Sequence, residues 1–343
     1  MSDAPILVTS AGGQTGSIGR SIVRGLRARG LAVRAFVRTD DSRAQDLREM
    51  GAEVFVGDLL NPRDVTLAVR GVKRIYFSMS LNPYYADATI LMAAAAEREG
   101  GCEIFVNMSD FEQDYMTLEN MSRPDAERIA ILGADVQWSP QQFVHWAAER
   151  ALDWSGLPVS HIQAAMFVEN PITLWMPAAT IKDDDTIRLP FGDAKTAPVA
   201  TVDVAEICIA ILAEPKGHEG TAYKLTGPAR KDWHEFAEDF SAALGRKITY
   251  APSTIEEFRA LLHKVMPQIP DHPARHLENL ALQNGGDRYI AEVTSDVERL
   301  LGRPATSMKA VIEAEAWRFE KNAPDQLQHR DLKDFDRRRA VAT

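Results

Sequence analysis

Three glycines near the N-terminus have a spacing that suits phosphate binding. Gly13, Gly16 and Gly19 form the pattern GxxGxxG between an apolar run at 6–9 and a segment of helical period. This spacing lets backbone approach a pyrophosphate, and free amides at a helix N-terminus attract the anion. Residues 10–12 lengthen the turn, so which glycine meets which phosphate is left open, and a tight helix start without a ligand is the alternative. The expected phosphate-side contacts are Gly13, Gln14, Thr15, Gly16, Ser17 and Gly19.

The end of the second apolar run indicates which dinucleotide binds. An acidic side chain there would accept hydrogen bonds from a ribose 2′-hydroxyl, whereas a basic one favours a 2′-phosphate. The run VRAFVR ends on Val37 and Arg38. A guanidinium pairs with phosphate through charge-assisted bonds, so we predict NADP(H), against a solvated loop arginine as the alternative. Where the third and fourth runs end, we expect further cofactor contacts from Asp58, Leu59, Ser78, Met79 and Ser80.

A histidine and a glutamate are placed to share one face of a predicted helix. His145 and Glu149 have the i, i+4 spacing that brings two helical side chains together. Glu149 could favour the charged imidazolium and orient the ring, which would make His145 a proton donor near neutral pH. The alternative is a surface or cap-contacting histidine beside a salt-bridged glutamate.

Other reactive side chains are expected to be structural. Cys102 and Cys208 lie in apolar segments without metal or disulfide spacing, so both are predicted core thiols. Asp203 is expected to cap or anchor its helix. Three histidines in HKVMPQIPDHPARH are irregularly spaced around a proline, which predicts solvated or helix-start positions and no metal site: His263, His272 and His276.

The elements that position these residues alternate along the first half of the chain. Short apolar runs are separated by segments of helical period, and they lie at 6–9, 32–37, 53–58, 74–79, 103–108 and 158–163. Such alternation predicts βαβ units, which right-handed crossovers turn into a doubly wound parallel sheet. The predicted fold class is therefore α/β, a Rossmann sheet with a smaller, mostly helical C-terminal domain.

The regularity of the pattern changes after the sixth run and divides the chain. We expect an NADP(H)-binding Rossmann domain at 1–165, to which 196–228 returns. A substrate-cleft domain is expected from 166–195 and 229–320, and the polar stretch 321–343 is expected to be a flexible tail.

Composition restricts the partners. The formal net charge is −10, from 39 basic and 49 acidic residues, which opposes attraction to nucleic acid. No signal peptide or apolar run of membrane-spanning length is evident, so no membrane partner and a cytoplasmic location are expected. An apolar helix at 88–96 either covers the sheet or forms a homodimer interface.

Several blocks of the sequence together resemble one family. They are GGQTGSIG, VRAFVR, EVFVGDL, FVNMSD, SPQQFVHWAAERALDWSGLPVSHIQAAMFVENP, IRLPFGDAKTAPVATVDVA and YKLTGP. The chain is similar over residues 5–320 to the NmrA-like branch of the atypical short-chain dehydrogenase/reductase superfamily. This resemblance implies an NADP(H)-binding Rossmann domain, with a smaller domain that closes a cleft over the nicotinamide. Members of the family resemble either reductases of quinones, azo dyes or triphenylmethane dyes, or nucleotide-sensing regulators without turnover.

The usual proton donor of the superfamily is missing here. It is a Tyr-x-x-x-Lys pair, and none of the 7 tyrosines has a lysine four positions later. His145 stands in the corresponding helix, and Ser109 occupies the place where related enzymes hold a substrate-contacting serine. A polar strand end is the other explanation for Ser109.

The missing acid limits the acceptors that this chain could reduce. A positioned acid contributes about 10²- to 10⁴-fold in rate, so activated, conjugated acceptors such as quinones and azo dyes are favoured over simple ketones. We predict an NADPH-dependent oxidoreductase of such small molecules. The alternatives are a non-catalytic NADP(H)-sensing regulatory protein and a lyase or isomerase that uses the nucleotide structurally. The expected pocket walls, which ordinary packing could also explain, are Tyr84, Tyr85, Phe167, Asn170 and Trp175.

Overall fold

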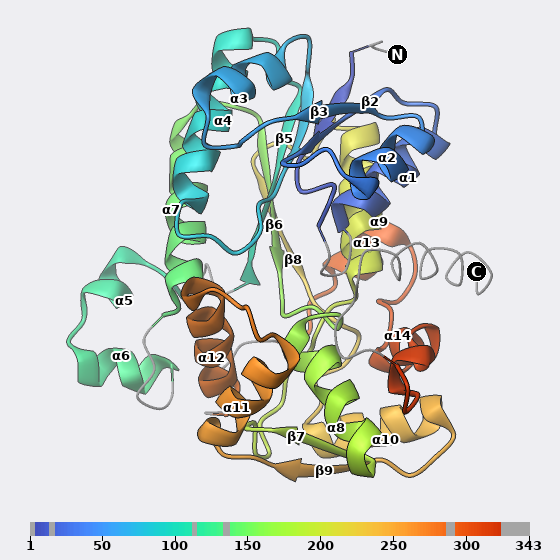
Figure 1. Ribbon diagram of the computed structural model, residues 1–343. Coiled ribbons are helices and arrows are strands. Elements are labelled where there is room, and N and C mark those ends of the chain that lie inside the picture. The colour runs from blue at the N-terminus through green and yellow to red at the C-terminus, as the bar shows by residue number, and fades with distance from the viewer. Residues whose placement is uncertain (1–3, 14–17, 112–114, 133–137, 286–291, 324–343) are drawn as a thin grey trace.

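A seven-stranded sheet forms the centre of the computed structural model, which describes residues 4–13, 18–111, 115–132, 138–285 and 292–323 (Figure 1). All its neighbouring strands are parallel, and their order is β3-β2-β1-β4-β5-β6-β8. The strands are β1 (Ile6–Val8), β2 (Val33–Val37), β3 (Glu53–Val56), β4 (Arg74–Phe77), β5 (Ile104–Asp110), β6 (Val159–Ala164) and β8 (Thr221–Leu225). The order reverses between β1 and β4, where doubly wound folds bind their ligands. The predicted fold class is confirmed.

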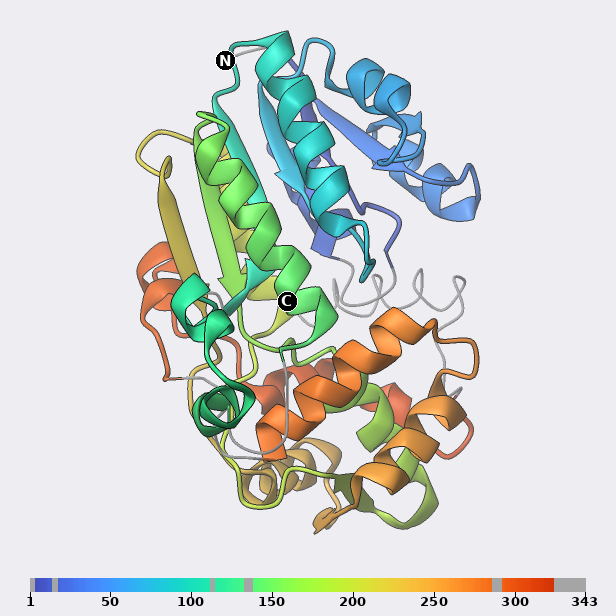
Figure 2. The ribbon, with the colours of Figure 1, turned by 90° about the vertical axis from the view of Figure 1, so that its left-hand side faces the viewer.

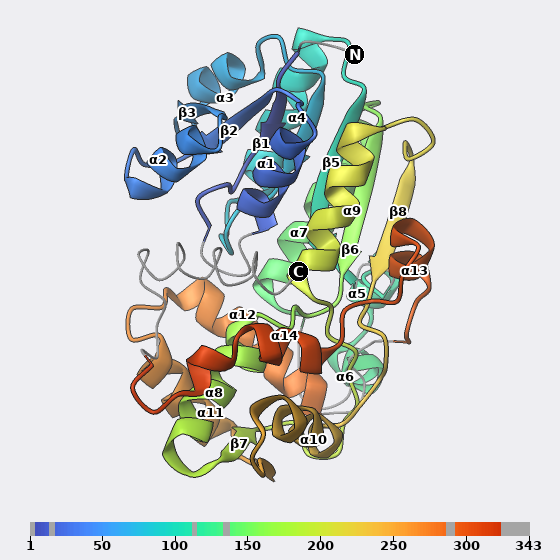
Figure 3. The ribbon, with the colours of Figure 1, turned by 90° about the vertical axis from the view of Figure 1, so that its right-hand side faces the viewer.

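Helices cover both faces of this sheet, as βαβ crossovers require. One face carries α1 (Ile18–Ala28), α2 (Ser42–Glu49) and α9 (Thr201–Ala213), as Figure 3 shows. The other face carries α3 (Pro62–Val69), α4 (Tyr85–Glu99) and α7 (Pro140–Trp154), and Figure 2 shows α4 beside α7. Two short helices, α5 (Leu118–Ser122) and α6 (Asp125–Leu132), precede α7.

The start of α7 is fixed by local sequence. Ser139 is the N-cap, and its hydroxyl accepts a hydrogen bond from the amide of Gln142 at 3.1 Å. The side chain of Gln142 returns to the Ser139 amide at 2.9 Å, which completes a capping box. Pro140 occupies the first turn, where its missing N–H costs no helical bond. These residues position the polar side chains that follow along α7.

The remaining elements gather below the carboxyl ends of the strands (Figure 1). They are η2 (Pro171–Trp175), α8 (Met176–Asp184), β7 (Thr186–Leu189), α10 (Trp233–Leu244), β9 (Thr249–Pro252), α11 (Ile255–Val265), α12 (Asp271–Gly285), α14 (Met308–Ala314) and η3 (Ala316–Phe319). They share one hydrophobic cluster that includes Trp233 and Phe240. The helix α13 (Asp296–Leu301) instead packs on α9. The division into domains remains a prediction, and most of the expected tail lies outside the described residues.

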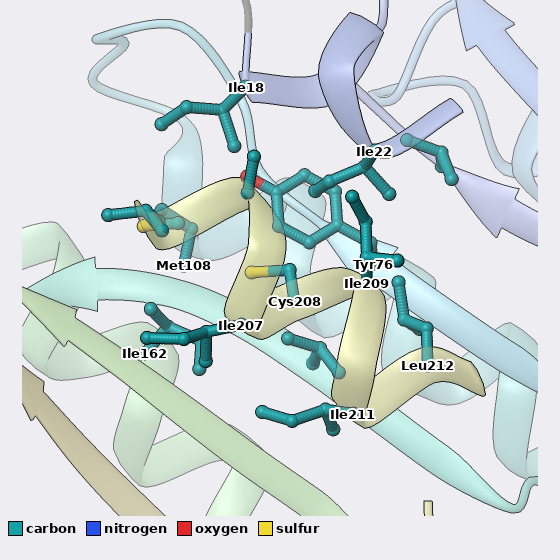
Figure 4. Packing of buried hydrophobic residues seen from close by; sticks show 14 of the residues in the cluster. Ile18, Ile22, Tyr76, Met108, Ile162, Ile207, Cys208, Ile209, Ile211 and Leu212 are labelled. Carbon is teal, nitrogen blue, oxygen red and sulfur yellow. The ribbon is translucent and has the colours of Figure 1, made fainter. Parts of the chain in front are cut away.

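The predicted core thiol Cys208 is fully buried within α9, among the isoleucines of that helix (Figure 4). Cys102 is only half-buried, two residues before β5. Within the described part of the chain, no helix is long and apolar enough to cross a membrane.

Candidate functional site

The glycine turn after β1 is closely packed against α1. A Cβ added to Gly19 would lie 2.7 Å from the carbonyl oxygen of Ser10, so no side chain fits there without moving backbone. Ser10 itself has a φ of 53°, and the amide of Gly13 donates to its oxygen at 3.1 Å. This geometry brings the N-terminus of α1 close to the turn, as a pyrophosphate site needs. Gln14, Thr15, Gly16 and Ser17 lie outside the described residues.

The loops after β1 and β4 are joined at the switch point. Thr9 Oγ1 donates to the carbonyl oxygen of Ser78 at 2.7 Å, and Ser10 Oγ donates to the same oxygen at 2.9 Å. The Ser78 amide donates to Thr9 Oγ1 at 2.8 Å. Ser78 and Met79 are half-buried at this edge, and Ser80 is exposed. These residues therefore border the opening where the strand order reverses.

The contacts expected after β2 and β3 lie at the same edge of the sheet. Arg38 is exposed and has no ion-pair partner among the residues that the structure describes. Asp58 is exposed too, and it accepts from the Leu60 amide at 2.9 Å, whereas Leu59 packs on a hydrophobic cluster. Of these three residues, Arg38 is therefore the one that can bind an anion.

A second arginine at this edge was missed by the sequence reasoning. Arg43, in the first turn of α2, lies 2.5 Å from Asp41 Oδ2 and donates to the carbonyl oxygen of Gly12 at 3.2 Å. Its hydrogen bond lowers the pKa of Asp41 to about 2. The available signal was the run RTDDSR, which places a second guanidinium one loop after Arg38.

His145 is buried on α7 and contacts an aspartate that the sequence reasoning did not single out. Its Nδ1 lies 2.8 Å from Asp110 Oδ2, at the carboxyl end of β5. Burial raises the pKa of the Asp110 carboxyl, but the attraction and hydrogen bond of a protonated His145, together with the attraction of a protonated His276, lower it on balance. On the other side of the ring, His145 Nε2 lies 2.7 Å from Gln141 Nε2. The ring of Tyr85 packs edge-on against the imidazole, with 4.3 Å between centroids.

Glu149 has partners other than the expected one. It shares the buried face of α7 with His145, but its carboxylate accepts from Gln163 Nε2 at 3.2 Å and lies 3.3 Å from Arg150. The prediction that Glu149 orients His145 is therefore wrong, because the Glu149 carboxylate accepts from Gln163 of β6 and His145 contacts Asp110 instead. Ser109 also lies on the side of β5 that faces α7. It is buried, and its hydroxyl has no hydrogen-bond partner among the described residues.

The expected pocket residues are placed in very different surroundings. Tyr84 is 58% exposed, at the start of α4. Tyr85 is only 1% exposed and donates to the Met108 carbonyl at 3.0 Å, so it is a core residue and not a surface that an acceptor could reach in this conformation. Trp175 is buried in the C-terminal cluster, and Asn170 caps η2 through the Ile172 amide. Phe167 is half-buried beside Val199.

Of the three histidines expected at solvated or helix-start positions, His263 is exposed and His272 lies in the first turn of α12, whereas His276 is buried. Pro273 lies in the first turn of that helix, where it is tolerated, so both flanking histidines belong to α12. His276 is buried, with Nδ1 2.8 Å from Ser139 Oγ, and His272 Nε2 lies 2.8 Å from Gln141 Oε1. Within the described ranges, no cluster of His, Cys, Asp or Glu could hold a metal ion.

Asp203 anchors α9 but does not cap it. The N-cap is Ala200, and the Asp203 carboxylate accepts from the Thr306 amide at 2.6 Å and from its hydroxyl at 2.7 Å. Arg303 lies 2.8 Å from the same carboxylate. Asp203 therefore ties the first turn of α9 to the segment before α14.

Comparison with known sequences identifies a family and several reductases. The model of an NAD(P)H-binding family matches residues 13–215. The chain is 29% identical over 310 residues to an NAD(P)H azoreductase of Xenophilus azovorans, which covers 90% of this chain and 97% of that protein. It is 30% identical over 301 residues to a (4-alkanoyl-5-oxo-2,5-dihydrofuran-3-yl)methyl phosphate reductase of Streptomyces griseus, covering 88% of this chain and 94% of the relative.

Solved structures share the fold over nearly the whole chain. An NADPH-dependent quinone oxidoreductase of Escherichia coli in complex with NADPH superposes with a TM-score of 0.71, at 22% identity, over 91% of this chain and 99% of that one. A mutant of NmrA superposes with a TM-score of 0.70, at 20% identity, over 91% of this chain and 95% of that one. The expected NmrA-like architecture is thereby confirmed.

Proposed function

The chain belongs to the NAD(P)H-binding family, and from this premise we propose that it is an NADPH-dependent reductase of small conjugated acceptors such as quinones and azo compounds. The observation that carries the proposal is the carboxyl edge of the sheet. Along that edge lie Gly19, which has no room for a side chain, an arginine without an ion-pair partner among the described residues after β2, and a histidine–aspartate pair at the end of β5. The full-length likeness to a protein named as an azoreductase supports the choice of acceptor.

The residues present fit a dinucleotide with a 2′-phosphate. Gly19 permits the close approach of α1 to the turn, which leaves helix amides for the pyrophosphate. Arg38, which follows β2 directly, would hold the 2′-phosphate, and Arg43 in the first turn of α2 could join it by exchanging its contact with Asp41. Ser78 to Ser80 would border the nicotinamide side. When bound, the nicotinamide supplies the hydride for the acceptor.

A reduced acceptor also needs a proton, and His145 is proposed to provide it in place of the missing tyrosine. The imidazole is held between Asp110 and Gln141, and the edge of the Tyr85 ring excludes water from one side. A protonated His145 would be stabilised by the Asp110 carboxylate. The hydride and this proton together complete a two-electron reduction.

The cofactor assignment is tested by exchanging NADPH for NADH. Arg38→Ala should lower the preference for NADPH by about 10- to 100-fold, because a hydrogen bond to a charged group contributes about 1.5–3 kcal/mol. Arg29→Ala is the matched control, since Arg29 is equally exposed at the far end of α1. A wild-type preference for NADH would contradict the proposal.

Turnover is tested by following NADPH oxidation with a panel of quinones, azo dyes and triphenylmethane dyes. We expect oxidation by the wild type and a loss of about 10²- to 10⁴-fold in His145→Ala. Tight NADPH binding without oxidation of any acceptor would overturn the reductase and favour a nucleotide-sensing protein.

A further inference from the structure

Gln141 joins three parts of the molecule through one buried amide. It lies in the first turn of α7, and its side chain is fully buried. Its Oε1 accepts from the backbone amide of Asn82 at 3.0 Å, in the loop after β4. The same oxygen lies 2.8 Å from His272 Nε2 of α12, and its Nε2 lies 2.7 Å from His145 Nε2.

The backbone of Asn82 determines which way this amide points. A backbone N–H can only donate, so the oxygen of Gln141 must face Asn82. The NH₂ group of Gln141 then faces His145 Nε2, which must accept and carries no hydrogen. The proton of a neutral His145 therefore lies on Nδ1, 2.8 Å from the carboxylate of Asp110.

A protonated His145 is incompatible with this arrangement. The imidazolium has an N–H at both nitrogens, so its Nε2–H would meet the NH₂ group of Gln141, donor against donor. Gln141 would have to turn over, and its NH₂ group would then face the Asn82 amide. The contact between α7 and the loop after β4 thus opposes the charging of His145.

We propose that Gln141 is a positioning residue that holds His145 as the neutral Nδ1–H tautomer, and that it must turn before His145 can carry a proton for the reduction. The proposal deepens the proposed function, because it rests on His145 being the proton donor. When His145 donates, the Nε2–H bond breaks, the proton bonds to the reduced acceptor, and the ring returns to the neutral Nδ1–H tautomer.

Other charged or titratable groups surround the pair. Asp110 faces the histidine from β5, and Tyr85 packs on it from α4. Glu149 lies one turn along α7, and α12 contributes His272, His276 and Arg275. Of these, only Asp110 touches a nitrogen of the His145 ring, so Gln141 controls the other nitrogen.

Gln141→Glu replaces the NH₂ group that faces His145 by a charged acceptor. A carboxylate keeps an acceptor for the Asn82 amide and for His272, but it offers His145 Nε2 an acceptor in place of a donor. The midpoint of His145 protonation should rise by about 1 to 3 pH units, as for other groups that gain an opposite charge in contact. Gln142→Glu is the matched control, because glutamate at that capping-box position suits the helix and Gln142 bonds Gln283 instead of His145.

The measurement is ¹⁵N NMR of the histidine rings in the intact protein. In the wild type, His145 should show a protonated Nδ1 and a bare Nε2, and in Gln141→Glu its midpoint should rise more than in Gln142→Glu. A wild-type Nε2–H tautomer, or an equal shift in the two variants, would overturn the proposal. If Gln141→Glu failed to fold, the wild-type tautomer would still decide. Neither readout uses NADPH or an acceptor, so failure of the proposed reductase activity is seen separately.

Discussion

The two faces of β5 and β6 are built from alternate residues of the same strands, yet the face toward α9 is mainly apolar and the face toward α7 carries buried polar side chains. Toward α9 the strands present Met108 and Ile162, which pack on Ile207, Cys208 and other apolar side chains of that helix (Figure 4). Toward α7 the same two strands present Asn107, Ser109, His161 and Gln163, all of them buried. The apolar face contributes stability through packing, whereas the polar face holds the residues that can carry protons.

The polar face is incompletely paired by protein groups. His161 is well held, with Nδ1 3.1 Å from Asn107 Nδ2 and Nε2 3.1 Å from Asp153 Oδ1. Three oxygens have no hydrogen-bond partner among the residues that the structure describes, namely those of the Asn107 amide, the Ser109 hydroxyl and the Gln163 amide. Buried polar atoms without a protein partner are commonly bonded to ordered water where several of them gather. We therefore expect ordered water beneath α7, where three such oxygens lie, and none at Ser160 Oγ beneath α9, whose neighbours are apolar.

The largest effect is expected on the apolar face. Ile162→Ala should lower the free energy of unfolding by about 2–5 kcal/mol, because the fully buried side chain leaves a cavity against α9. Urea denaturation measures the change, and the variant should keep its NADPH oxidation per folded molecule. A loss below about 1 kcal/mol would show that this face is not closely packed.

A change of similar size in the free energy of unfolding is expected with pH, because α12 buries a histidine against the start of α7. Burial lowers the pKa of His276 from 6.5 to about 4. The unfolded chain therefore binds more protons between these values, so the free energy of unfolding falls as the pH drops from 6.5 to 4, by about 3 kcal/mol in total.

This dependence is measured by urea denaturation across that pH window. His276→Gln should flatten it by the stated amount, whereas His263→Gln should not, since His263 is exposed at the end of α11. An unchanged slope in His276→Gln would mean that the buried ring is already charged in the folded protein.

How much the sequence could predict depends on how far apart in the sequence the interacting residues lie. The apolar runs and the parallel sheet depend on local patterns, and they were predicted correctly. The phosphate contacts of the glycine turn stay a prediction, since residues 14–17 lie outside the described part of the chain. The i, i+4 spacing correctly placed Glu149 on the same helix face as His145, but it could not reveal Gln163 from another strand. His276 was misplaced for the same reason, because its partner Ser139 lies 137 residues away. The partners of polar side chains were thus decided by tertiary contacts that no local pattern encodes.

A smaller loss of stability is expected when one partner of a buried hydrogen-bonded pair on the polar face is removed. Gln163→Leu removes the donor to both oxygens of Glu149 and should cost about 1–3 kcal/mol in the free energy of unfolding. The double variant Glu149→Met with Gln163→Leu replaces both partners by apolar groups and should recover most of the loss. Additive losses in urea denaturation would show that the two side chains do not interact.

The smallest effects should differ in sign between the two faces. Ser109 and Ser160 are both buried, and neither hydroxyl has a hydrogen-bond partner among the described residues, but Ser109 faces α7 while Ser160 shares the face of Ile162. Ser160→Ala should leave stability unchanged or raise it by up to about 1 kcal/mol, because an unsatisfied hydroxyl is lost from apolar surroundings. Ser109→Ala should lower stability by up to about 1 kcal/mol, because a water-bonded hydroxyl is lost. Thermal unfolding of the two variants side by side measures this difference. Equal shifts would mean that the polar face holds no water, and that the two faces differ only in which side chains they bury.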